Sequence, residues 1–225
     1  MSSVIPILLF VVIGFATSNL IDYEPKYFIW SLGSFVGLVW GFLLINILKV
    51  FKSKTIATIL LYISTAIMTI LFGGSLFLML INYVLDTTAI LELMRPPAGG
   101  GIFFFITFNS LLELILLQAT LYTCSKFSTN TVLKYLYAAI FPFFAARIWT
   151  YFYFVPTIFQ FMKIPSNEVL SPATQADITI WVNLSWIRCF IDGFCSLCLF
   201  VAVYYHTISL GIIDTDEHQK TKKVV

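Results

Sequence analysis

Continuous apolar runs of roughly 20 residues constrain this chain more than any other feature. Their apolar residues do not alternate with polar ones, as they would in a half-buried strand. Inside a lipid bilayer every backbone N–H and C=O needs a partner within the protein, so only helices and closed barrels can cross. The chain is also 60% hydrophobic and only 11% charged, whereas a soluble domain is about 45–50% apolar and about 25% charged. The sequence therefore predicts an all-α, polytopic membrane protein.

The apolar runs predict a single helical domain, residues 1–213, followed by a mobile polar tail, residues 214–225. The six transmembrane helices are expected at residues 4–20, 27–48, 56–85, 102–122, 133–155 and 178–212. The first run lacks the positively charged segment of a signal peptide, which favours a retained span over a cleaved signal. A short interfacial helix is expected after Asp86, before the Pro-Pro and Gly-Gly-Gly breakers.

Lysine and arginine residues are distributed unequally between the two sets of loops that six spans create. The side with more basic residues is expected to be cytoplasmic, so both termini should lie in the cytoplasm, with the chain in a bacterial inner (plasma) membrane. No block of basic residues points to nucleic acid as a partner. One side would carry Lys49, Lys52, Lys54, Lys126, Lys134, Lys220, Lys222 and Lys223, and the other Lys26, Arg95 and Lys163.

Glycines recur at every fourth position of the second predicted span, at Gly33, Gly37 and Gly41. Residues four apart lie on one face of a helix, and small residues there let a second helix approach closely. This glycine ridge predicts a packing surface for another helix. A membrane-protein partner or a second copy of the chain could supply that helix.

Ionisable residues inside the predicted spans are the candidate functional residues, because a charge is costly at membrane depth. Glu113 and Arg147 are expected near mid-depth, and Arg188 near the outer interface. Asn109 with Glu113, and Arg188 with Asp192, are spaced four apart and so share a helical face. Pairing of Glu113 with Arg147 and of Arg188 with Asp192 stays open, as does a choice between a structural network and a functional pocket.

The first functional hypothesis is a pocket between spans four, five and six that binds a lipophilic small molecule. Membrane lipids are expected to surround the chain. Arg147 and Arg188 would orient an oxygen or anionic group, and Glu113 or Asp192 would act as a base. The alternatives are a non-catalytic subunit or scaffold of a membrane complex and a small proton- or cation-coupled transporter, although no internal repeat supports the latter. The ligand-binding candidates are Asn109, Trp149, Tyr151, Trp181 and Trp186.

Histidine usage predicts no metal site and no haem. The chain has only two histidines, and His206 and His218 lack the spacing of a ligand pair. His206 is expected as an interfacial histidine near the cytoplasmic boundary. No cofactor is predicted.

A segment around the last two spans resembles the anthrone-oxygenase-like group of small membrane proteins. Pro156 and Thr157 match a Pro-containing outer loop of that group, and Trp181, Leu184 and Arg188 match the opening of its last helix. The resemblance implies a four-helix unit over residues 56–212, with the first two spans as an addition. It also implies oxygenation of a polyketide anthrone without metal or flavin. Whether the chain is an enzyme is left open.

Overall fold

The computed structural model describes residues 4–18, 20, 26–50, 53–94, 100–165 and 169–222, and all regular structure in these ranges is helical. Five helices there are long and apolar enough to cross a membrane. The predicted class, an all-α integral membrane protein, is confirmed. The five helical segments are Phe28–Val50, Lys54–Val84, Phe104–Phe127, Asn130–Phe161 and Pro172–Gly211.

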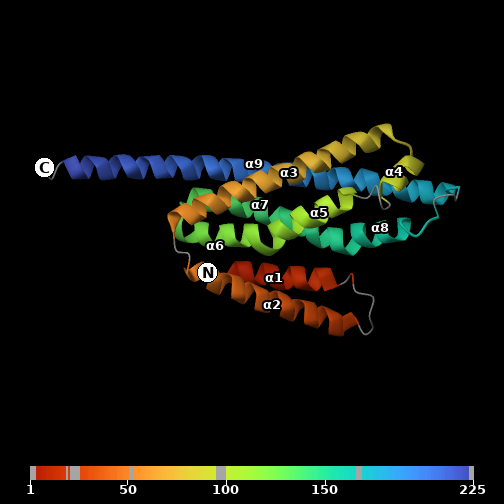
Figure 1. Cartoon of the computed structure of the whole chain (residues 1–225), viewed down its shortest axis with the longest axis horizontal. Coiled ribbons are helices and arrows are strands. Elements are labelled where there is room, and N and C mark those ends of the chain that lie inside the picture. Colours follow the sequence, from red (N-terminus) through yellow and green to blue (C-terminus); the bar gives the residue numbers. More distant parts are fainter. Residues whose placement is uncertain are drawn as a thin grey trace.

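An N-terminal hairpin of two helices forms one side of the molecule. Helix α1 spans Val4–Ser18 and α2 spans Lys26–Val50, and they run side by side along one edge of the bundle (Figure 1). With 15 residues, α1 is about 22 Å long, which is shorter than the roughly 30 Å of a hydrocarbon core. It is therefore a short apolar helix beside the five long ones.

The glycine ridge of α2 packs against α1 of the same chain. A Cβ atom added at Gly33 would collide with the carbonyl oxygen of Gly14, and one added at Gly37 would collide with that of Phe10. The two backbones can be this close because neither glycine has a side chain. Association of copies through this ridge stays a prediction, and it would require α1 to leave the face.

Helices α3 (Lys54–Val84) and α9 (Pro172–Lys222) cross the whole bundle, and α9 packs against both α3 and α7 (Asn130–Trp149). Their shared core contains Leu61, Met68, Phe143 and Leu199, all with no exposed surface. The Ser171 side chain accepts a 3.1 Å hydrogen bond from the amide of Thr174, so Ser171 caps α9 as serine commonly does. The helix continues to Lys222, through most of the predicted tail. Residues 223–225, Lys52 and Arg95 lie outside the described residues.

A short helix, α4 (Thr87–Met94), is present where the sequence predicts an interfacial helix. Asp86 accepts a 2.8 Å hydrogen bond from the amide of Ala89, which satisfies one of the free N–H groups at the helix start. The apolar face of α4 buries Ile90 and Leu91 in a small cluster that also contains Trp181. This cluster lies at the end of the bundle opposite the chain termini (Figure 1).

The fourth span is not a uniform α-helix. It consists of α5 (Gly100–Leu111), the π-helical turn η1 (Leu112–Leu116) and α6 (Leu117–Phe127). The amide of Leu117 donates to the carbonyl of Leu112, five residues earlier. One residue is therefore inserted relative to α-helical spacing. The span also ends later than the predicted residue 122, because the helix continues through the polar residues before Ser128.

The fifth span has a second π-helical turn, η2 (Thr150–Phe154), between α7 and α8 (Val155–Phe161). Pro156 is the second residue of α8. Proline has no N–H to donate and crowds the carbonyl four residues earlier, which here belongs to Phe152 in η2. A widened turn accommodates both effects. The helix thus passes through Pro156 and Thr157. The loop that the family resemblance implies at these two residues is wrong, as is the predicted helix end at residue 155.

Candidate functional site

Three buried charged residues from three helices meet inside the bundle. Arg147 of α7 lies between Glu113 of η1 and Asp192 of α9, and each of the three is only 1% exposed. Arg147 Nε is 3.8 Å from Glu113 Oε1, and Arg147 Nη2 is 3.9 Å from Asp192 Oδ1. An arginine keeps its charge in proteins, so two carboxylates flank one guanidinium.

Each carboxylate also accepts one hydrogen bond. The Tyr151 hydroxyl donates to Glu113 Oε2 over 2.6 Å, and the Ser75 hydroxyl donates to Asp192 Oδ2 over 3.4 Å. The oxygens that face Arg147 have no hydrogen-bond partner within the described residues, because an ion-pair distance near 4 Å exceeds the ~3.2 Å reach of a direct bond. The short Tyr151–Glu113 bond is therefore the tightest polar contact of the cluster.

Both partners of that bond occupy π-helical turns. Glu113 is the second residue of η1 and Tyr151 the second residue of η2. π-Turns inside α-helices are rare and occur frequently at functional sites, since the extra residue re-aims the side chains around it. The indole of Trp40 in α2 donates a 2.8 Å hydrogen bond to the carbonyl of Leu114 in η1. The N-terminal hairpin is thus attached directly to the irregular turn.

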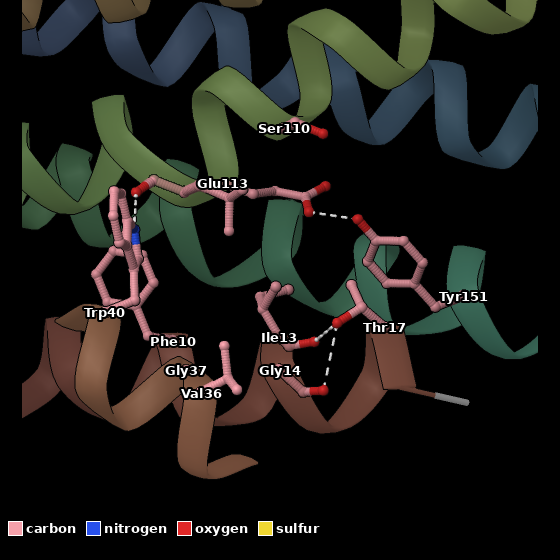
Figure 2. A pocket seen from close by; sticks show the side chains of 11 residues that line it. Phe10, Ile13, Gly14, Thr17, Val36, Gly37, Trp40, Ser110, Glu113 and Tyr151 are labelled. Carbon is pink, nitrogen blue, oxygen red and sulfur yellow. Dashed lines mark hydrogen bonds between the residues drawn. The ribbon is translucent and has the colours of Figure 1, made fainter. Parts of the chain in front are cut away.

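A cavity of about 370 Å³ lies between the hairpin and the two π-turns. Figure 2 shows the carboxyl group of Glu113 pointing toward Tyr151 across from α1, with Ser110 on the same side as Glu113. The hairpin supplies most of the apolar wall, and the fourth and fifth spans supply most of the polar wall. The lining residues are Phe10, Ile13, Gly14, Thr17, Val36, Gly37, Trp40, Ser110, Glu113, Leu114 and Tyr151.

The polar groups of this cavity are mainly hydrogen-bond acceptors. The Thr17 hydroxyl donates a 2.8 Å hydrogen bond to the carbonyl of Ile13, and the Tyr151 hydroxyl donates to Glu113. Each of these hydroxyl oxygens keeps a free lone pair. Ser110 makes no hydrogen bond to any described residue. The Ser110 hydroxyl can donate or accept, while the other polar side chains offer acceptors, so the cavity favours a molecule whose polar end donates hydrogen bonds.

Arg188 does not join the charged cluster, although it lies one turn from Asp192 on α9. Its guanidinium carbon is 4.3 Å from the centre of the Phe154 ring, and within the described ranges it makes no ion pair. Asp192 pairs with Arg147 instead. Of the two pairings left open by the sequence, the structure contains Glu113–Arg147 and lacks a close Arg188–Asp192 pair.

The tryptophans predicted as ligand contacts lie away from the cavity. Trp149 and Trp181 pack edge-on against Phe154, and the Trp181 indole donates to the carbonyl of Phe154 over 3.4 Å. Trp186 packs near Phe190. The rings of Trp149, Phe154 and Trp181 belong to the cluster that includes the apolar face of α4, and Arg188 lies over Phe154 in this cluster.

The location of the cavity differs from the predicted pocket between spans four, five and six. The hairpin replaces span six as a wall, so of the predicted residues only Glu113 and Tyr151 line it. Asn109 is buried nearby, and its side-chain oxygen has no partner among the described residues. The sequence alone does not reveal that the hairpin forms a wall of the cavity, because Phe10, Val36 and Trp40 resemble ordinary lipid-facing residues.

His206 forms a second buried polar site, which the sequence interpretation missed. It has no exposed surface, because it is packed between the start of α3 and the end of α6. Its expected depth near the cytoplasmic boundary stays a prediction. Its Nε2 lies 2.8 Å from Thr58 Oγ1 and its Nδ1 lies 3.1 Å from Ser128 Oγ. The partners are 148 and 78 residues away in sequence, so no local pattern could reveal them.

Comparison with known proteins gives no relative from which a role could be transferred. No family model, no curated protein and no solved structure matches this chain. The likeness of Trp181 and Arg188 to the anthrone-oxygenase-like group stays a prediction.

Proposed function

We propose that the chain is an integral membrane protein that binds a lipophilic small molecule in the cavity between the α1–α2 hairpin and the two π-turns. The proposal rests on a cavity of about 370 Å³ that has apolar walls and one polar wall. In the polar wall, the Tyr151 hydroxyl donates a hydrogen bond to Glu113. Ligand pockets are generally mainly apolar, with a few fixed polar groups and volumes of roughly 300–1,000 Å³. The cavity has these properties.

The buried charges behind the polar wall support the same proposal. Burying an ion pair is rarely more stabilising than packing apolar side chains of similar volume. Apolar side chains in place of Glu113, Arg147 and Asp192 would therefore be expected to stabilise a membrane bundle at least as well. The charged residues do, however, hold the Glu113 carboxyl in one position beside the cavity, as a binding group requires.

We also propose that the chain crosses the membrane six times, with both termini in the cytoplasm. A short α1 can cross if the bilayer thins locally or flanking residues reach the interface, which costs fractions of a kcal/mol per Å of mismatch. Both chain ends lie toward the same end of the bundle in Figure 1. The helix ends with Lys49, Lys54 and Lys126 are at that end, and those with Lys26 and Lys163 are at the other. This asymmetry supports a cytoplasmic assignment for the lysine-rich end.

Cysteine labelling tests this topology. The exposed residue Thr55 is in the first turn of α3, and the exposed residue Val169 comes shortly before α9. Figure 1 shows the starts of α3 and α9 at opposite ends of the bundle. In a background without the four native cysteines, Val169→Cys should react with a membrane-impermeant maleimide in intact cells. Thr55→Cys should react only after permeabilisation. The reverse pattern, or reaction of both in intact cells, would refute the proposed topology.

Native mass spectrometry of gently extracted protein tests ligand binding. We expect a bound small molecule whose retention is lost in Val36→Phe, because Val36 lines the cavity. Val39→Phe is the matched control, since Val39 is on the same helix, is 42% exposed and does not line the cavity. A stoichiometric protein partner in place of a small molecule would instead favour the non-catalytic subunit.

A further inference from the structure

Two carboxylates share one close cation in the buried cluster. Glu113 and Asp192 both face Arg147, which is the one cation within ion-pair distance of either carboxylate in the described part of the chain. Arg188 is turned toward Phe154. Arg188 nevertheless acts electrostatically on Asp192, whereas Arg147 is the cation that acts on Glu113. An unbalanced charge is costly in a low-dielectric interior. A cationic group beside Glu113 would therefore give this carboxylate a partner that it does not share.

Of the three charged residues in the cluster, Glu113 is the one that lines the cavity. Arg147 approaches Glu113 on its Oε1 atom, and Tyr151 approaches it on Oε2, while the cavity is lined by Glu113 and Tyr151 but not by Arg147 or Asp192. A ligand in the cavity therefore meets a carboxylate and a phenol oxygen without meeting the guanidinium. This arrangement favours a cation over an anion.

We infer that the ligand is a lipophilic amine, whose protonated nitrogen binds Glu113 and the Tyr151 oxygen while its apolar part lies against Phe10 and Ile13. An ammonium group has three donors and no acceptor, which complements the acceptors of Thr17, Tyr151 and Glu113. The rings of Phe10, Trp40 and Tyr151 line the same cavity, and aromatic faces attract cations. This inference rests on the proposed binding function.

A series of three probes with the same apolar tail tests the inference. Phenylbutylamine, phenylbutanol and phenylbutyrate would be titrated by calorimetry into the full chain in neutral nanodiscs at neutral pH. Non-specific partition into the lipid would be subtracted with nanodiscs that contain no protein. We expect the amine to bind about tenfold more tightly than the alcohol, because a charge-assisted hydrogen bond replaces a neutral one, and the butyrate to bind least.

Variants at two carboxylates assign the preference to Glu113. Glu113→Gln should reduce amine affinity to that of the alcohol and leave alcohol affinity unchanged. Asp177→Asn, which removes an exposed carboxylate from α9, should keep the tenfold preference. If Glu113→Gln does not fold, the order of the three probes on the native chain still decides the question.

The outcomes separate the two proposals. If amine and alcohol bind equally and Val36→Phe abolishes both, the amine inference is overturned and cavity binding stands. If the butyrate binds most tightly, the amine inference is also overturned. If none of the three probes binds saturably, both the inference and the proposed function are wrong.

Discussion

The hydroxyl of Tyr151 donates a 2.6 Å hydrogen bond to Glu113 Oε2, and each of the two residues is the second residue of a π-helical turn. Two separate irregularities, one in each of two spans, thus come together at a single polar contact. The contact forms the polar wall of the cavity and lies directly beside the pair that Glu113 makes with Arg147.

Removing the Tyr151 hydroxyl should destabilise the protein. Tyr151→Phe leaves Glu113 Oε2 buried without this donor, which costs roughly 1–3 kcal/mol for a buried unsatisfied group. The free energy of unfolding can be measured by titration with a denaturing detergent. Tyr153→Phe, in the same π-turn, is the control, because the Tyr153 hydroxyl makes no hydrogen bond to a described residue. Equal losses in the two variants would contradict the role assigned to the bond.

Removing the central cation should cost more than removing the second arginine. Arg147→Met leaves Glu113 and Asp192 buried without their shared cation, and breaking a buried ion pair in this way costs about 3–5 kcal/mol. Arg188→Met loses mainly a cation–π contact with Phe154, which is worth about 0.5–2 kcal/mol. Unfolding free energies of both variants, measured in the same detergent, give the comparison.

This order would be contradicted by an Arg188→Met variant that is destabilised as much as Arg147→Met. Such a result would mean that Arg188 neutralises Asp192 despite the absence of a close contact. The double variant distinguishes the cases further, since independent residues give additive losses.

Two glycine substitutions should act in opposite directions. In Gly37→Ala the new methyl group meets the backbone carbonyl of Phe10, so α1 and α2 must separate, at a cost of about 1–3 kcal/mol typical of overpacking. In Gly73→Ala nothing lies within 4 Å of the new methyl group, and alanine favours the helix by about 0.5–1 kcal/mol. Thermal unfolding midpoints should fall for the first and rise or stay unchanged for the second. A stable Gly37→Ala variant would contradict the close hairpin packing.

The ring of His206 should be neutral with its proton on Nε2. The Thr58 hydroxyl donates to the carbonyl of Lys54 at 3.0 Å, so Thr58 Oγ1 must accept a proton from Nε2, which lies 2.8 Å away. Ser128 is then the donor to Nδ1, 3.1 Å away. Nitrogen-15 NMR of histidine-labelled protein would show a protonated Nε2 and an unprotonated Nδ1. His218→Asn identifies the signals, because the chain has only two histidines, and the opposite tautomer would refute the assignment.

The charged residues show how far sequence can locate a site. Glu113 and Arg147 stand out as ionisable residues deep in apolar spans, and the structure pairs them. The spacing of Arg188 and Asp192 allowed an ion pair within one helix. In the structure, however, Arg188 makes a cation–π contact with Phe154, and Asp192 pairs with Arg147. Helical spacing says which residues share a face, but partners on other helices decide which contacts form.

The sequence by itself determined that the chain is a helical membrane protein, because long apolar runs can satisfy their backbone groups in lipid only by closing hydrogen bonds within helices. It also determined that α2 has a face for close packing, since glycines every four residues leave no side chains there. Only the tertiary structure decided that α1 occupies this face and that the hairpin, rather than the last span, closes the cavity beside Glu113. That outcome depends on contacts between residues far apart in sequence, such as the rings of Phe15 in α1 and Phe152 in η2, which no local pattern encodes.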